Sequence, residues 1–212
     1  QRGRVYPDLM QQFTRFCQQG SDKAVEQIRR ADAIFFNGGD QSLTLQAFKL
    51  EDGSVSAELK QIQSMLEAGQ IIVAGTSAGT AVMSGGSYQG RITPMISNGD
   101  SYHALQYGAK ATAAPWPGCR KEQRCPDDIS ERQLTYTAAG GLGLFPLGVL
   151  DTHFAERGRQ ARLLVLQQST QTRLAFGVDE ASAMLVDLGH YATGLVQMAA
   201  RGAGEIYVSE LQ

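Results

Sequence analysis

The feature that most constrains this fold is the alternation of short apolar runs with segments of helical pattern. The runs AIFFN (33–37) and QIIVAG (70–75) are continuous and are stopped by glycines. Such runs are typical of strands buried on both faces of a parallel sheet. Helical patterns cover about 41–48 and 56–68, and another begins after Ser77. The alternation predicts an α/β architecture with a mostly parallel sheet.

Length and composition indicate a single domain, 1–212, built around one core. The chain has 212 residues, of which 42% are hydrophobic and 19% are charged, as in an ordinary globular protein. Its net charge is -2, so no basic surplus is available to neutralise a phosphate backbone, and we expect no nucleic-acid partner. No apolar run approaches the roughly 20 residues of a membrane-spanning helix, so we expect no membrane association.

The region 85–140 differs from the rest of the chain. It is rich in Gly, Pro, Ser, Thr and Tyr and has no helical period, which predicts strands and a long excursion over the surface. It contains Cys119 and Cys125, whose spacing is compatible with a small disulfide ring or with two free thiols, whereas Cys17 lies in an amphipathic stretch. The compartment therefore stays open: cytoplasmic, or secreted or periplasmic if the disulfide forms.

The pentapeptide GTSAG (75–79) follows the second apolar run directly. A nucleophilic hydroxyl that projects from a strand end requires a sharp turn with small residues on either side, and Gly75 and Gly79 meet that requirement. The helix that starts after Ser77 directs free N–H groups toward the same point, where they can stabilise an oxyanion. We therefore interpret Ser77 as a nucleophile, although Gly-x-Ser-x-Gly also occurs by chance in a chain with 24 glycines.

A serine nucleophile needs a base, and the chain has three histidines. His153 directly follows an apolar run, as expected of a residue presented at a strand end. His103 lies in the 85–140 region, and His190 lies in a Gly-His-Tyr turn typical of a solvated surface. His153 is therefore the preferred base, with a half-buried structural histidine as the alternative.

The base needs a carboxylate to orient it, and two are candidates. Asp151 is two residues from His153, so in an extended segment their side chains point the same way. Glu180 ends the run AFGVDE, at a sheet edge where the active sites of open α/β proteins gather. Asp179 points away from Glu180 and is predicted to be structural.

These segments also resemble a known family in their order and spacing. GGDQ (38–41), GTSAG (75–79), DTHF followed by RGR (151–159) and GVDE (177–180) are similar to the motifs of the cyanophycinase-like serine peptidases. That family is related to the peptidase E aspartyl dipeptidases and shares the fold of class I glutamine amidotransferases. The resemblance covers about 30–190 and implies a doubly wound, mostly parallel sheet with helices on both faces.

The family pattern assigns a role to each matching residue of the triad and the oxyanion hole. It implies that Ser77 is the nucleophile, His153 the base and Glu180 the third member of the triad. Gly39 and Ala78 match the backbone donors to the oxyanion. The pattern begins with an earlier Gly-rich strand, so we expect residues to be missing before Gln1.

Substrate contacts are also implied by the resemblance. Gln41 and Arg157 match residues that position an aspartate-derived substrate, and an arginine suits a carboxylate because its planar fork binds both oxygens. Asp151 and Thr152 belong to the same substrate-binding stretch, with Thr152 standing where cyanophycinases have Gln. Arg159 is expected on a solvated helix face.

The resemblance implies hydrolysis of aspartyl peptide bonds through an acyl-enzyme, with release of β-Asp-Arg dipeptides from cyanophycin. We expect an Asp-rich peptide or polypeptide as substrate and neither a metal nor an organic cofactor. The alternatives are an aspartyl dipeptidase of the peptidase E type and a catalytically inactive binding protein of the same fold. The resemblance also implies a homodimer, for which the sequence offers no separate argument.

Overall fold

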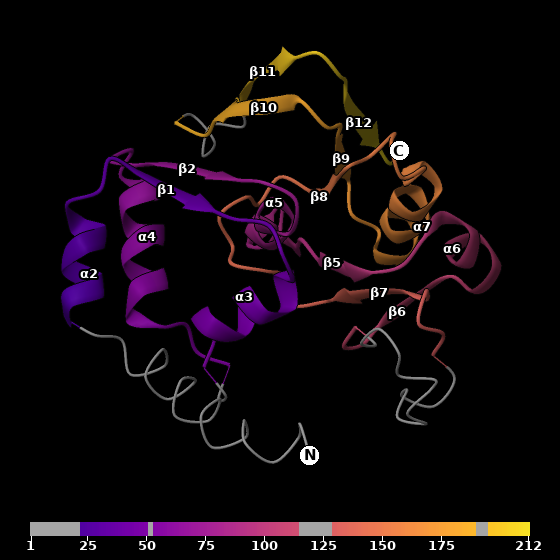
Figure 1. Ribbon diagram of the computed structural model, residues 1–212, viewed down its shortest axis with the longest axis horizontal. Helices are drawn as coiled ribbons and strands as arrows, with labels where there is room; N and C mark the ends of the chain where they lie inside the picture. Colours follow the sequence, from indigo (N-terminus) through magenta and orange to yellow (C-terminus); the bar gives the residue numbers. More distant parts are fainter. Residues whose placement is uncertain (1–21, 51–52, 115–128, 190–194) are drawn as a thin grey trace.

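The computed structural model describes residues 22–50, 53–114, 129–189 and 195–212 (Figure 1). The amphipathic stretch around Cys17, the three cysteines and His190 lie outside the described residues. Among the described residues, no helix combines the length and the apolar character that a membrane crossing requires.

The first part of the chain has the predicted alternation of helices and strands. Strand β1 pairs in parallel with β2, with Ala33 opposite Ile72. Helices α2 and α4 lie side by side below this pair in the view of Figure 1. In chain order the elements are α2 (Asp22–Arg29), β1 (Ala33–Phe36), α3 (Gln41–Phe48), α4 (Ala57–Glu67), β2 (Ile72–Gly75) and α5 (Ala78–Met83).

Side-chain caps explain where two of these helices begin. The Asp40 carboxylate accepts a hydrogen bond from the Ser42 N–H at the start of α3, and the Ser56 hydroxyl accepts one from the Leu59 N–H at the start of α4. Each cap satisfies a backbone donor that has no partner within the helix. The GGDQ stretch thus ends β1 and begins α3 within a few residues.

The described part of the 85–140 region contains the predicted strands, but it is not mainly a surface excursion, which corrects that half of the prediction. Met95, Ile96 and Leu134 are fully buried, and a helix occurs where none was predicted. The Asp100 carboxylate caps that helix by accepting from the His103 N–H, and the helix packs against α7 (Gln160–Thr170). The elements are β3 (Ser87–Tyr88), β4 (Arg91–Ile92), β5 (Met95–Asn98), α6 (Ser101–Tyr107), β6 (Ala109–Ala111) and β7 (Leu134–Thr137).

The last part of the chain contains the second parallel pair that matters for the site. Strands β8 and β9 run parallel, with Thr152 opposite Val178, and β12 adds to β9 in the antiparallel direction. Strands β10 and β11 form a separate antiparallel ribbon at the top of Figure 1. The elements are β8 (Val149–Thr152), α7 (Gln160–Thr170), β9 (Leu174–Val178), β10 (Ser182–Asp187), β11 (Gln197–Gly202) and β12 (Ile206–Glu210).

The mixed α/β class is confirmed, but a single doubly wound sheet is not observed. Within the described ranges the strands form small sheets: β1 with β2, β12-β9-β8, β5-β7-β6, β10 with β11, and β3 with β4. Parallel and antiparallel pairs both occur. Helix α5 contacts both β2 and β8, so packing against this helix joins the two parallel pairs where a continuous ladder was expected.

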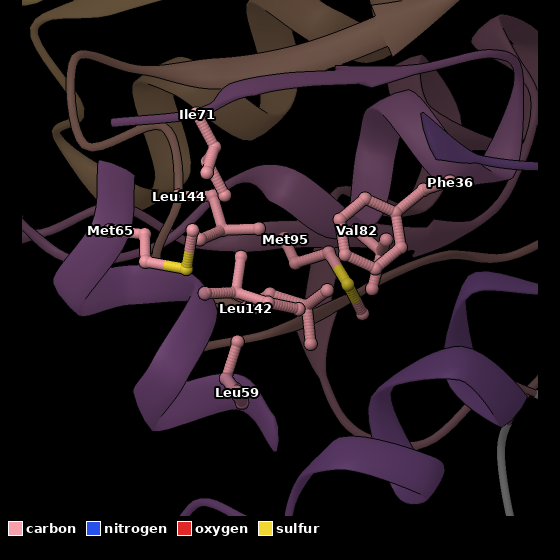
Figure 2. Packing of buried hydrophobic residues seen from close by; sticks show 9 residues of the cluster. Phe36, Leu59, Met65, Ile71, Val82, Met95, Leu142 and Leu144 are labelled. Carbon is pink, nitrogen blue, oxygen red and sulfur yellow. The ribbon is translucent and has the colours of Figure 1, made fainter. Parts of the chain in front are cut away.

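A buried cluster of apolar side chains holds β1, α4 and α5 together (Figure 2). Phe36 belongs to this cluster, and Val73 of β2 packs against it. On the opposite face of the same strands, Phe35 and Ile72 are 65% and 70% exposed. The prediction that these strands are buried on both faces is therefore wrong, because the described elements cover only one face of the pair.

Candidate active site

Ser77 occupies the sharp turn between β2 and α5. Its backbone has φ 55 and ψ -121, a strained conformation that side-chain-bearing residues adopt rarely and mostly at functional sites. The flanking glycines are required sterically. A Cβ on Gly75 would lie 2.6 Å from the carbonyl carbon of Gly79, and one on Gly79 would overlap the carbonyl group of Phe36. The turn is therefore a nucleophile elbow in its geometry.

A chain of hydrogen bonds links Ser77, His153 and Glu180. The Ser77 Oγ and the His153 Nε2 are 2.8 Å apart, and the His153 Nδ1 and the Glu180 Oε1 are also 2.8 Å apart. A neutral imidazole fits this arrangement by donating its Nδ1–H to the carboxylate and accepting the serine O–H at Nε2. A separation of Ser77 and His153 would have favoured the alternative of an inactive binding protein, and the contact between them gives that alternative no such support.

Parallel strand ends bring the three side chains together. His153 follows the last residue of β8, and Glu180 lies two residues beyond the end of β9. Because β8 and β9 are parallel neighbours, their carboxyl ends lie at the same edge. Ser77 follows β2 at the end of the other parallel pair. The site thus forms at the carboxyl ends of strands, the usual place in open α/β proteins.

Two backbone N–H groups beside the serine are free to donate. A Cβ on Gly38 would lie 3.7 Å from the Ser77 Oγ, so the loop after β1 approaches this hydroxyl closely. Among the hydrogen bonds of the described residues, none uses the N–H of Gly39 or of Ala78. Their role as oxyanion donors remains a prediction.

Gln41 is anchored beside this loop. Its Nε2 donates to the carbonyl oxygens of Ile96 and Ser97, at 3.0 and 3.1 Å. The side chain thereby ties the start of α3 to β5. Since the amide nitrogen is engaged, the Oε1 is the atom that Gln41 can offer to a substrate.

Asp151 is not available to a substrate, which corrects the expectation for this residue. It is 1% exposed. Arg162 binds both carboxylate oxygens through one edge of its guanidinium, with the Nε 2.7 Å from Oδ2 and the Nη2 2.5 Å from Oδ1. Arg159 adds a third contact, with its Nη1 3.2 Å from Oδ1. The carboxylate is therefore shared between two arginines, and Glu180 rather than Asp151 contacts the His153 ring.

The expectation that Arg159 lies on a solvated helix face is wrong, because its side chain is largely buried. Its Nη1 donates to the carbonyl oxygen of Thr152, at 2.6 Å, as well as to Asp151. Burial and the neighbouring Arg162 lower the pKa of Arg159 to about 10 against the opposing effect of Asp151, so the guanidinium is charged at neutral pH. Thr152 is itself buried, whereas Arg157 is exposed and remains the candidate for a substrate carboxylate.

Two residues near the site were missed by the sequence argument. Arg162 is one of them. It lies four residues before Leu166, on the buried face of α7, and this spacing could have indicated that Arg162 is buried. Glu156 is the other, since its Oε1 accepts from the Glu180 N–H at 2.8 Å. Nothing in the local pattern marks Glu156. Asp179 is structural, as predicted, because its Oδ1 accepts from the Ala155 N–H at 2.9 Å.

The other described histidine, His103, takes part in a separate contact at the start of α6. The His103 Nδ1 is 2.8 Å from the Asp100 Oδ1, at the start of α6. No group of three or more His, Cys, Asp and Glu side chains in the described part of the chain is arranged to hold a metal ion.

Fold and site together define a class of protein: an α/β protein in which a serine at a sharp strand-to-helix turn is hydrogen-bonded to a histidine, and the histidine to a glutamate. Comparison with known proteins narrows this class. The chain is 28% identical over 174 residues to the cyanophycinase of Geminocystis herdmanii (strain PCC 6308), covering 82% of this chain and 50% of that protein. It is 28% identical over 182 residues to the cyanophycinase of Synechococcus elongatus, covering 86% and 43%.

These similarities confirm the resemblance to the cyanophycinase-like peptidases, although the chain spans only about half the length of these relatives. No protein-family model matches the chain. Among solved structures, a peptidase from an acI-B1 Actinobacterium superposes with a TM-score of 0.52 at 16% sequence identity, covering 90% of this chain and 58% of that one. This likeness shows a shared fold.

Proposed function

We propose that this chain is a serine-type peptidase of the cyanophycinase-like kind, which hydrolyses aspartyl peptide bonds through an acyl-enzyme. The observation that carries the proposal is the pair of 2.8 Å contacts joining Ser77 to His153 and His153 to Glu180. A nucleophile, a base and an orienting carboxylate linked in this order are the groups that a triad uses for acyl transfer.

In the first step the Ser77 Oγ attacks the carbonyl carbon of the scissile peptide while the His153 Nε2 takes the hydroxyl proton. The negative charge that develops on the carbonyl oxygen is stabilised by the N–H groups of Gly39 and Ala78. Glu180 stabilises the imidazolium that forms. The C–N bond then breaks, His153 returns the proton to the leaving amine, and a serine ester remains.

In the second step a water molecule takes the place of the leaving amine. His153 removes a proton from this water as the water oxygen attacks the ester carbonyl. The bond from that carbonyl to the Ser77 Oγ then breaks, His153 returns the proton to the Oγ, and the acid product leaves. The His153 side chain is 22% exposed, so it is accessible from solvent. The mechanism uses only groups of this chain and water.

The proposed substrate class is an aspartate-derived peptide, with cyanophycin as the specific case. The names of the curated relatives support it, as does the exposed guanidinium of Arg157 in the turn that follows His153. A planar guanidinium binds a free or side-chain carboxylate through paired hydrogen bonds. Thr152 stands where cyanophycinases have Gln, so the preference between polymer and dipeptide is the part of the proposal that most needs a direct test.

The nucleophile is tested with a serine-directed fluorophosphonate probe followed by peptide mapping. We expect a single labelled residue, Ser77, in the wild-type protein and no labelling in Ser77→Ala. Ser64→Ala, an exposed position on α4, is the matched control and should label like the wild type. Labelling at another serine, or none in a folded sample beside a reactive serine hydrolase, would contradict the proposal.

The substrate is tested by incubating wild type and Ser77→Ala with cyanophycin and, separately, with α-aspartyl dipeptides. Release of β-Asp-Arg from the polymer, lost in Ser77→Ala, is the expected result. Cleavage of the dipeptides alone would keep the serine mechanism and replace the substrate with that of a peptidase E type enzyme.

A further inference from the structure

Two segments that carry triad residues are joined by a reciprocal pair of hydrogen bonds. In one direction the Ala155 N–H donates to the Asp179 Oδ1, at 2.9 Å. In the other direction the Glu180 N–H donates to the Glu156 Oε1, at 2.8 Å. Each segment thus gives one backbone donor and one carboxylate to the other. We call these four residues, Ala155, Glu156, Asp179 and Glu180, the turn clamp.

The clamp lies beside the contact between His153 and Glu180. Ala155 is two residues after His153, and Glu180 is both a member of the clamp and the partner of the imidazole. The clamp therefore fixes the separation of the two backbones from which the imidazole and the carboxylate project. Both hydrogen bonds have a charged acceptor, which makes them stronger than bonds between neutral groups.

The Glu180 carboxylate depends on such an anchor because its side chain is 55% exposed. An exposed glutamate samples several rotamers, and packing alone does not hold it. His153 also has a positive φ of 48, a strained conformation that persists only when its surroundings enforce it. Both partners are therefore sensitive to a loosening of the backbone between them.

The Asp179 half of the clamp is anchored further into the protein, whereas the Glu156 half is not. The Asp179 Oδ2 accepts from the Glu205 N–H at 3.2 Å, and Asp179 is buried. Glu156 is exposed. Removing the Glu156 side chain is therefore expected to release the Glu180 N–H without disturbing the core.

We propose that Glu156 is a positioning residue, which holds the Glu180 backbone so that its carboxylate stays on the His153 Nδ1. The inference deepens the proposed function and rests on the roles given there to His153 and Glu180. It assigns to an exposed glutamate a part in catalysis that acts through Glu180 and involves no contact with substrate.

The test compares Glu156→Ala, which removes the acceptor, with Glu156→Gln, which keeps an acceptor oxygen at the same reach. Glu156→Asp keeps the charge and shortens the reach, and it carries the test if the alanine variant does not fold. The readout is the low-field proton NMR signal of the His153 Nδ1–H. Because the chain has three histidines and the His103 ring also contacts a carboxylate, His153→Asn assigns the signal.

We expect the signal to be present in wild type and Glu156→Gln, and lost through exchange with water in Glu156→Ala, Glu156→Asp and Glu180→Ala. Fluorophosphonate labelling of Ser77 should slow about tenfold in Glu156→Ala, as expected of a small displacement of a catalytic group. Glu67→Ala, which removes an exposed glutamate on α4, is the matched control and should change neither readout.

An unchanged signal in folded Glu156→Ala, or no signal in the wild type, would overturn the role of Glu156. Failure of the proposed function looks different: Ser77 would not label, while the signal would still respond to Glu156 as expected. In that case the clamp holds and the serine mechanism does not.

Discussion

The two parallel strand pairs that carry the site differ in how they are buried. Every residue of β8 is buried, and Ala175 and Phe176 of β9 are fully enclosed. The β1–β2 pair instead exposes Phe35 and Ile72 on one face. Both pairs nevertheless deliver loops to the same site. A site at strand ends thus requires fixed ends, which one covered face can provide, and does not require strands covered on both faces.

The pairs also differ in charge. β8 contains Asp151, whose carboxylate is buried with Arg162 and Arg159, whereas β1 and β2 consist of AIFF and IVAG. The β8–β9 pair therefore depends on a buried ionic group that is costly to disturb. The β1–β2 pair depends on apolar packing and on the close approach of Gly79 to the Phe36 carbonyl group.

The largest effect is expected from Asp151→Ala, because it leaves the buried charge of Arg162 and the half-buried charge of Arg159 without their carboxylate. Breaking such a group costs about 3–5 kcal/mol of unfolding free energy, measurable by urea denaturation. Asp32→Ala removes an exposed carboxylate just before β1 and should stay within about 0.5 kcal/mol. A small loss for Asp151→Ala would show that solvent reaches the arginines.

The next effect concerns apolar packing in β8. Leu150 is 1% exposed, so Leu150→Ala leaves a cavity and should cost about 2–5 kcal/mol. The same denaturation experiment measures it, and a value below about 1 kcal/mol would contradict the tight packing of this pair.

The matching substitution in the other pair is expected to be mild. Ile72 is 70% exposed, so Ile72→Ala should cost less than about 1 kcal/mol of unfolding free energy. A loss similar to that of Leu150→Ala would erase the contrast between the pairs and would mean that the exposed face is covered in solution.

The smallest effect is expected beside the buried pair, at the start of α6. Burial raises the pKa of Asp100, but hydrogen bonds from His103 and the charges of His103 and Arg132 outweigh it, so the pKa lies below its ordinary value. A carboxylate with a lowered folded-state pKa stabilises the protein above its unfolded pKa of about 3.9 and loses this contribution as the pH falls through the folded value. Asp100→Asn should therefore be slightly less stable than wild type at neutral pH, and the difference should vanish in strong acid. A difference that grows in acid would contradict this sign.

Local signals in the sequence determined a large part of the fold and the candidate site. The bounds of α3 match the predicted 41–48, since the cap at Asp40 and the glycines before it act over a few residues. The elbow at Ser77 was predictable because steric crowding at a sharp turn selects glycine on both sides. His153 and Glu180 were identifiable because apolar runs end just before them, and the family resemblance selected them together. Their catalytic roles stay predictions until labelling is measured.

Tertiary structure alone decided which side chains met. Asp151 and Glu180 were both candidates to orient His153. The packing of α7 places Arg162 against Asp151, so that Asp151 pairs with this arginine. The arrangement of the sheets decided which face of β1 and β2 was left uncovered, although these strands are more apolar than the fully buried β8. Glu156 and Glu180 are 24 residues apart, and no local periodicity encodes a contact of that kind. Local conformation depends on neighbouring residues in the chain, whereas burial and pairing depend on how distant elements pack.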